Sequence, residues 1–502
     1  MVEPVYERIN YTRSVTKLKG QSKVELKTEI PSTTVSNLLT LSTWTAPVED
    51  KIKDGEVNSQ TKVVFYLSYV NDAGEITKHE CSTGANCSIK DQSITDACKS
   101  KTSVIVEKAE IDTAGAYVCV RAHLSFLTEI YLTESVNALV NGSELIVNDG
   151  EIEYIKGLGE KRGVYPVEEE FDLNYSVKEV LFHRAQGVIT AVQSGVGCII
   201  VDGQLLLSLV LLQNNDKNDI IKENKVFPFR AEIECEEAMP NMMSVARVIE
   251  RSFKTDVAVE ESGGKSTVSI CANLLFEGEA FITQTTPVAT DVFSLKNQVQ
   301  VQRESIAMTT ACEIRSHNLT IKESAVVSEL PVGAVVLAVS GEKANIINTE
   351  CKEDGLWVVG TVTATALLKD GDAKVFVRKL EIPFEQTFEG AYDCQMQPQV
   401  TVKAHSARAR VSTLTQMELE SELFFTVYPT RKCIKNVIKS VDLAEEKPLN
   451  TSAITVYIAR EGEELWSLAK RLNVSPNELV ETNKDLQFPL TGEERIIIYR
   501  GL

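Results

Sequence analysis

A strand–turn–strand pattern that occurs three times constrains the fold of this 502-residue chain more than any other feature. Each occurrence begins at an Asp-Gly pair, and the glycines lie 148 and 152 residues apart. The pairs are Asp54-Gly55, Asp202-Gly203 and Asp354-Gly355, and the apolar runs behind them cover residues 63–70, 205–212 and 357–364. Each run meets a turn rich in Asn, Asp or Gly, which tolerate positive φ, at residues 71–74, 214–217 and 369–372. The same order in three places predicts an internal triplication.

The pattern within the repeats favours strands over helices. Several segments alternate apolar and polar residues with period two, which is typical of a strand with one buried face. In two repeats the second strand ends in a Pro-Phe motif, Phe227-Pro228-Phe229 and Ile382-Pro383-Phe384, which the first repeat lacks. We therefore predict a mainly β fold with three tandem β-sandwich-like domains at residues 1–150, 151–302 and 303–440.

The C-terminal segment has a different pattern. Residues 441–453 contain Glu-Glu-Lys-Pro and are interpreted as a polar linker. In residues 454–502, a strand at 454–458 precedes an apolar face at helical spacing in 465–472, a Ser475–Glu478 capping box and a strand at 495–499. This order predicts a small β-α-α-β unit, in which Trp466, Leu468 and Leu479 are core residues.

Both parts resemble known families. The segments Val226-Phe-Pro-Phe-Arg230 and Lys379-Leu-Glu-Ile-Pro-Phe384 resemble the SPOCS domain, a β-rich unit of spore-coat assembly proteins in endospore-forming bacteria. The segment from Val456 through Glu464-Leu-Trp-Ser-Leu-Ala-Lys-Arg-Leu472 to Asn483 is similar to the LysM module. The resemblance implies three SPOCS domains followed by one LysM module.

LysM modules bind glycans that contain N-acetylglucosamine in a groove between two loops, here residues 460–465 and 486–492. The resemblance implies that the ligand-binding residues are Gly462, Glu463, Glu464, Leu465, Asn483, Phe488, Pro489 and Leu490. The family usually has Gly-Asp-Thr where this chain has Gly462-Glu463-Glu464. A bulky anion that faces a neutral sugar costs desolvation. A protein partner, or an acidic cap on the first helical turn, therefore fits as well as a glycan.

The layout resembles coat morphogenetic proteins of the SipL/SpoVID type. The resemblance implies a non-catalytic scaffold or adaptor in endospore coat assembly. It would act in the mother-cell cytoplasm, at the forespore or spore coat surface. Its LysM module would dock to the SpoIVA-type basement-layer protein, or to peptidoglycan or its lipid-linked precursor. The alternative is an envelope protein that binds peptidoglycan through N-acetylglucosamine.

Other function classes find little support in the sequence. A formal net charge of −19 repels phosphate backbones, so nucleic acid is not an expected partner. The segment Gly263-Gly264-Lys265-Ser266 lacks the earlier glycine of a phosphate-binding loop and is interpreted as a hairpin turn. His79, Cys81, Cys87 and Cys98 match no standard zinc spacing. We expect no catalytic residues, no metal and no cofactor, and therefore no enzyme.

The sequence also bears on compartment. The odd number of cysteines, 11, favours reduced thiols in a cytosolic protein. Residues 1–4 show no secretory signal. The longest apolar stretch, residues 196–212, contains Asp202-Gly203, so it is interpreted as two short strands joined by a turn, and no transmembrane segment is expected.

Overall fold

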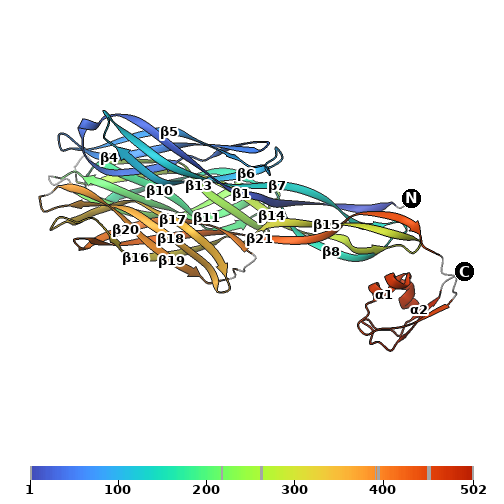
Figure 1. The fold of residues 1–502 in the computed structure, drawn as a ribbon. Coiled ribbons are helices and arrows are strands. Elements are labelled where there is room, and N and C mark those ends of the chain that lie inside the picture. Colours follow the sequence, from blue (N-terminus) through green and yellow to red (C-terminus); the bar gives the residue numbers. More distant parts are fainter. Residues whose placement is uncertain are drawn as a thin grey trace.

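The computed structural model describes residues 3–215, 219–259, 264–372, 374–390, 392, 396–448 and 454–499. Strands make up most of these residues, so the prediction of a mainly β fold is confirmed. An elongated β body carries a small helical unit beside one tip (Figure 1). Neither α-helix in the described ranges has the length needed to cross a membrane. Part of the turn expected at 214–217, Gly263 of the expected hairpin turn and residues 449–453 of the expected linker lie outside the described residues.

Three sets of strands follow one another along the chain. The first set is β1 (Pro4–Pro31), β2 (Val35–Thr45), β3 (Glu49–Lys53), β4 (Glu56–Asn71), β5 (Ile76–Lys90), β6 (Lys99–Asp112) and β7 (Tyr117–Gly142), with a 3-10 turn at Ser32–Thr34. The second set is β8 (Ile146–Gly157), β9 (Lys161–Leu173), β10 (Val177–Ser194), β11 (Cys198–Gln213), β12 (Ile220–Glu234), β13 (Met243–Val259) and β14 (Ser266–Phe293). The third set is β15 (Asn297–Ala311), β16 (Arg315–Val326), β17 (Val335–Lys352), β18 (Gly355–Lys369), β19 (Val375–Phe388), β20 (Met396–Thr413) and β21 (Gln416–Glu446).

Each set, called a copy below, has the same antiparallel pairing. Its long last strand, β7, β14 or β21, lies at the centre of one sheet. The first half of that strand pairs with β6, β13 or β20 on one side and with β1, β9 or β16 on the other. The second half pairs with the N-terminal part of β1, with β8 or with β15 as a two-stranded ribbon. The second sheet of each copy has β4, β11 or β18 at its centre.

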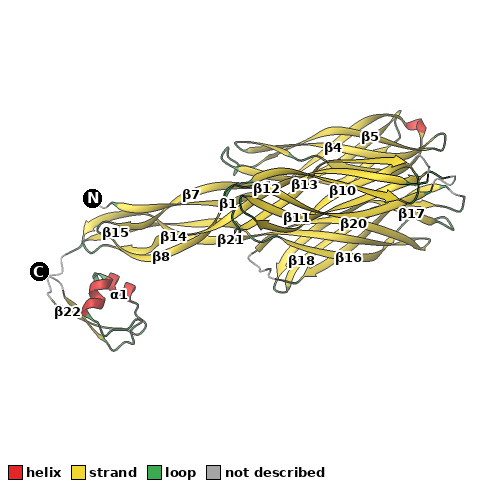
Figure 2. Ribbon diagram, turned by 180° about the vertical axis from the view of Figure 1, so that it is seen from behind, coloured by secondary structure: helices red, strands yellow, loops and turns green. Residues whose placement is uncertain are grey.

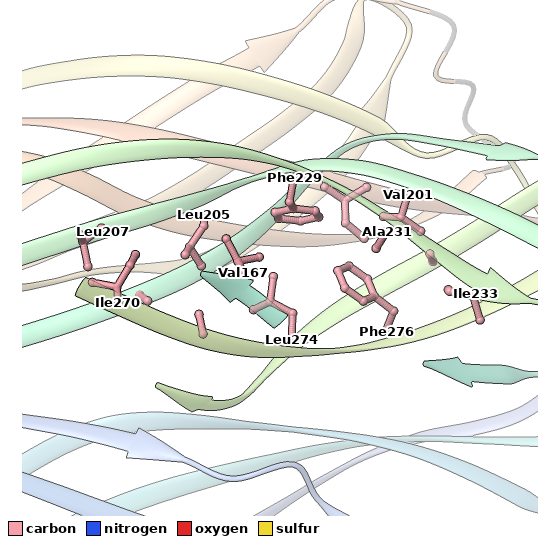
Figure 3. Close-up of a cluster of buried hydrophobic side chains, with 14 of the residues drawn as sticks. Val167, Val201, Leu205, Leu207, Phe229, Ala231, Ile233, Ile270, Leu274 and Phe276 are labelled. Carbon is pink, nitrogen blue, oxygen red and sulfur yellow. The ribbon is translucent and has the colours of Figure 1, made fainter. Parts of the chain in front are cut away.

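The two sheets of each copy share one apolar core. In the second copy, Leu205 and Leu207 of β11 pack with Ile270, Leu274 and other residues of β14 (Figure 3). The central strand β11 is buried on both faces between Leu205 and Leu212, which explains its continuous run of aliphatic residues. The other two copies have equivalent clusters. Burial of these faces is the main stabilising contribution within each copy.

The three copies surround a common axis instead of lying end to end. Their ribbons extend together from the body as a tapering stalk (Figures 1 and 2). Inside the stalk, Ile9 of β1, Ile152 of β8 and Ile306 of β15 meet in one buried cluster. Deeper in the body, Leu39 of β2, Leu181 of β10 and other residues of all three copies form a second shared cluster. The copies therefore form one body with a shared interior.

The Asp-Gly pairs do not all mark the same place, and the interpretation of residues 196–212 as two strands is wrong. Asp202 and Gly203 lie inside the continuous strand β11. The position equivalent to Gly55 is Gly197. Both glycines have positive φ. The Gly55 N–H donates to the Ile94 carbonyl and the Gly197 N–H donates to the Ala238 carbonyl, so each glycine is bonded to a loop that follows it in the chain.

Gly203 is needed because the chain packs closely at this point. A Cβ there would collide with the ring of Phe229 and the carbonyl of Val188. In the third copy Gly360 lies under Phe384 in the same way. The Phe of each Pro-Phe motif therefore covers a glycine of the neighbouring strand.

The expected boundaries need correction. Divisions at 150/151 and 302/303 cut through β8 and β15, which begin at Ile146 and Asn297. The linker does not begin at 441, because β21 stays paired with β15 as far as Glu446. The residues that the expected boundaries separate from β8, β15 and β21 are paired within the ribbons of the stalk.

We predict that Ile152→Ala lowers the free energy of unfolding by about 2–5 kcal/mol, because it leaves a cavity between the three ribbons. Equilibrium denaturation measures this change. Ile434→Ala is the matched control, because this residue of the same stalk is 65% exposed, and we expect a change within about 0.5 kcal/mol. Equal effects of the two substitutions would contradict a shared stalk core.

Candidate binding site

The C-terminal unit consists of β22 (Ile454–Ile458), α1 (Leu465–Leu472), α2 (Pro476–Thr482) and β23 (Arg495–Tyr499). The two strands pair antiparallel. Leu468 and Leu479 are each 1% exposed and pack with Ile496 and Ile498, as predicted for core residues. Ser475 occupies the N-cap position of α2, but its side chain makes no capping hydrogen bond, so the expected capping box does not form.

The two loops of the expected groove lie side by side. The Gly462 N–H donates to the Leu490 carbonyl at 2.8 Å, and the Leu490 N–H donates to the Glu463 carbonyl at 3.0 Å. Gly462 has φ +79°, which favours glycine at this turn. A side chain at Gly492 would press on the backbone of Glu461. The structure thus brings together the loops that the resemblance selects.

The carboxylate of Glu463 is engaged by other residues of the same unit. It accepts hydrogen bonds from the Arg460 N–H at 3.0 Å and the Tyr457 hydroxyl at 3.1 Å, and it pairs with Arg471. Burial alone would raise the pKa of Glu463, but these three donors lower it below its usual value. Glu463 therefore orders the first loop of the expected groove, and its contact with a ligand stays a prediction.

Glu464 differs from its neighbour because its side chain is exposed. It occupies the N-cap position of α1, and its side chain makes no capping hydrogen bond. The alternative role as an acidic cap is therefore not what the structure shows. Of the two adjacent carboxylates, only Glu464 is presented to solvent.

The other expected site residues divide between framework and surface. The Asn483 amide donates to the carbonyls of Leu479 and Ile497 and accepts from the Ile497 N–H, which joins α2 to β23. Leu490 is 2% exposed and belongs to the core. Leu465 and Phe488 are half-buried against that core, whereas Pro489 is exposed. Gly462, Glu464 and Pro489 remain as the accessible part of the site.

Sequence reasoning missed Glu494, which orders the second loop. Its carboxylate accepts hydrogen bonds from the backbone N–H groups of Thr491, Gly492 and Glu493 and from the Thr491 hydroxyl. These donors, the Thr491 N–H first, lower the pKa of Glu494 to about 2. The signal in the sequence was a carboxylate three residues after a threonine, which is typical of local side-chain-to-backbone bonding.

Trp466 is not a core residue of the unit, contrary to the prediction. Its indole N–H donates to the Asp291 carboxylate of β14 at 2.9 Å, and its ring meets the edge of Phe293 with centroids 5.2 Å apart. Lys470 also pairs with Asp291, at 2.6 Å. The first and last turns of α1 thus contact the tip of the stalk.

Asp291 is the electrostatic centre of this contact. Arg303 of the stalk pairs with its other oxygen at 3.1 Å. Partial burial would raise the pKa of Asp291, but the hydrogen bonds from Lys470, Trp466 and a backbone N–H lower it. A further bond joins the Asn473 amide to the Leu295 carbonyl at 2.7 Å. Polar contacts and one aromatic pair therefore hold the unit against the stalk.

The cysteines that the structure describes give no sign of a metal site. In the described ranges they are all free thiols, and no group of three or more His, Cys, Asp or Glu side chains could hold a metal ion. Cys87, Cys98 and Cys235 are buried, and the others are half-buried. Burial is the main cause that raises the pKa of Cys81, to about 11, so this thiol remains protonated at neutral pH.

Comparisons with protein-family models, with characterised proteins and with solved structures found no match to this chain.

We predict that Asp291→Asn releases the C-terminal unit from the stalk, because the Lys470 and Trp466 donors of the unit lose a charged acceptor. Hydrogen bonds to a charged group contribute about 1.5–3 kcal/mol, so the docked population should fall about tenfold or more. Small-angle X-ray scattering would detect this as an increase in the maximum dimension.

Acidification should also release the C-terminal unit from the stalk, and small-angle X-ray scattering detects this in the same way. The docked state lowers the pKa of Asp291, so docking is complete above the usual aspartate pKa and is lost as the pH falls below it. Asp485→Asn is the control for the Asp291→Asn substitution, because this carboxylate of the C-terminal unit is exposed. Unchanged scattering from Asp291→Asn would contradict the role of Asp291.

Proposed function

We propose that this protein is a non-catalytic scaffold of endospore coat assembly, built from three SPOCS-like β-sandwich domains and a terminal LysM-like docking module. The observation that supports it best is the position of the terminal unit. The unit contacts the stalk tip through Trp466, Lys470 and Asn473, whereas Glu464 and Pro489 stay exposed. The accessible loops are therefore free to meet a partner while the body holds the unit in place.

The exposed Glu464 favours a protein partner over a plain glycan. The exposed carboxylate of Glu464 on one loop and the exposed Pro489 on the other suit a basic or hydrogen-bond-donating surface, such as that of a SpoIVA-type basement-layer protein in the mother cell. A peptidoglycan precursor is the second partner within this proposal. The module is tethered to a large body with further exposed sheet edges, so weak contacts of both parts gain avidity.

The alternative function is binding of peptidoglycan through N-acetylglucosamine in the envelope. The engagement of Glu463 within the unit favours it, because one of the two carboxylates that would oppose a neutral sugar is engaged by other residues of the same unit. The two candidate functions therefore differ in what Glu464 contacts.

We predict that removal of residues 449–502 abolishes localisation to the spore surface and leaves the β body folded. The body keeps its last strand, because β21 ends at Glu446. Fluorescence microscopy in sporulating cells and circular dichroism of the purified truncation measure the two results. Asp291→Asn is the control, since it frees the module without altering its loops and should still localise. A truncated protein that reaches the spore surface would contradict docking through the module.

We predict that the native protein does not sediment with insoluble peptidoglycan and that Glu464→Thr does, because the substitution removes the desolvation cost of a carboxylate against a neutral sugar. Glu481→Gln, an exposed carboxylate of α2, is the matched control and should behave as the native protein. Sedimentation of the native protein would favour the envelope alternative instead.

A further inference from the structure

A cavity of about 990 Å³ lies in the β body where the three copies meet. Equivalent strands of the three copies line most of it, namely β2, β10 and β17, and β6, β13 and β20. Residues of β1, β4, β5 and β7 of the first copy complete the wall. A smaller cavity of about 220 Å³ shares part of this wall, including Glu250 and Lys403. The space is thus a product of the assembly of the copies around the axis, and no single copy contains it.

The charged groups at the rim of this axial cavity differ from those inside it. At the rim, Lys19 pairs with Glu107 at 3.0 Å, and both side chains are well exposed. Inside, Lys403 pairs with Glu250, and each side chain is only about one-fifth exposed. Both pairs are neutral overall, so they do not give the cavity a net charge. Lys62 and Glu80 of the wall are both exposed and carry opposite charges.

Arg184 and Lys343, further inside, have no carboxylate bonded to them among the described residues. Arg184 of β10 donates to the backbone carbonyl of Glu342. Lys343 of β17 donates to the Thr43 hydroxyl of β2 at 3.0 Å. The Glu342 carboxylate, which lies nearby, is engaged by Lys222 at 3.0 Å. The interior therefore holds an excess of positive charge when Lys343 is protonated.

This excess is costly in the empty protein. Burial, and then the proximity of Arg184, lower the pKa of Lys343 to about 7. A buried cation without an opposite charge destabilises a fold, and replacement by an apolar side chain often stabilises it. An anion that entered the cavity would remove this cost.

The rest of the wall combines polar and apolar side chains. Tyr66, Phe182 and Phe253 contribute aromatic surface, and Ile346 and Val402 contribute aliphatic surface. The volume is in the range of pockets that hold small organic ligands, which combine apolar walls with a few polar groups that orient the ligand. A bare inorganic ion would leave these walls uncovered.

We propose that the axial cavity binds a small amphiphilic anion, a carboxylate with an aliphatic or aromatic body, whose charged group pairs with Arg184 and Lys343. The apolar body lies against the aromatic and aliphatic wall. The ligand contacts all three copies and therefore joins them. The site is separate from the terminal unit, so it does not depend on the docking function proposed above.

Isothermal titration calorimetry of the full chain with decanoate tests the proposal, with decanol as the uncharged control. We expect saturable decanoate binding, no comparable decanol binding, and at least a tenfold loss of decanoate affinity in Lys343→Met. Lys343→Arg keeps the charge and should retain binding. Lys484→Met, an exposed lysine of the terminal unit, should bind as the native protein does.

Thermal unfolding separates a ligand site from a purely structural lysine. Without ligand, Lys343→Met should unfold at the same or a higher temperature than the native protein, and decanoate should stabilise only the native protein. Absence of decanoate binding, equal binding of decanol, or unchanged affinity in Lys343→Met would overturn the proposal. A lower unfolding temperature of Lys343→Met, with no decanoate effect on the native protein, would assign Lys343 to packing alone.

Discussion

The structure depends on the pairing of three long strands along their whole length. In each copy, β7, β14 or β21 is central to a sheet over its first half and half of a stalk ribbon over its second. The strand pairs leave apolar faces that a single ribbon cannot bury, and a two-stranded ribbon is marginally stable alone. The cluster around Ile152 solves this by bringing three ribbons together, so each copy needs the other two.

Closure around the axis has two structural consequences at opposite ends of the molecule. At the stalk, the ribbons place Asp291 and Phe293 at a tip where a small unit can dock. In the body, neighbouring copies meet at the shared cluster around Leu39 and through polar contacts, such as that of Lys343 of the third copy with Thr43 of the first. These contacts are sparse compared with the cores, which is why a large space remains between the copies. One arrangement thus creates both the tip and the cavity.

The sequence predicted the strands well because alternation reports directly on a buried face. It could not predict closure, since Ile9, Ile152 and Ile306 have the same alternating pattern whether their face meets a copy of the same chain or another sheet. Gly203 was assigned to a turn because Asp-Gly favours turns locally, and only the position of Phe229 reveals a close approach. Trp466 was misassigned for a related reason: helical spacing does not say which neighbour a side chain will find.

The close approach of a glycine and a phenylalanine on neighbouring strands also explains why the first copy lacks the Pro-Phe motif. Where the other copies pair Gly203 with Phe229 and Gly360 with Phe384, the first copy pairs Thr61 with Ala85. A larger residue on the central strand and a smaller one on its neighbour fill similar space. The Thr61 hydroxyl also donates to the Ala46 carbonyl at 2.7 Å, at the place where Gly203 approaches the Val188 carbonyl. The absent Pro-Phe motif therefore reflects an alternative packing of the same strand pair and leaves the architecture of the copy intact.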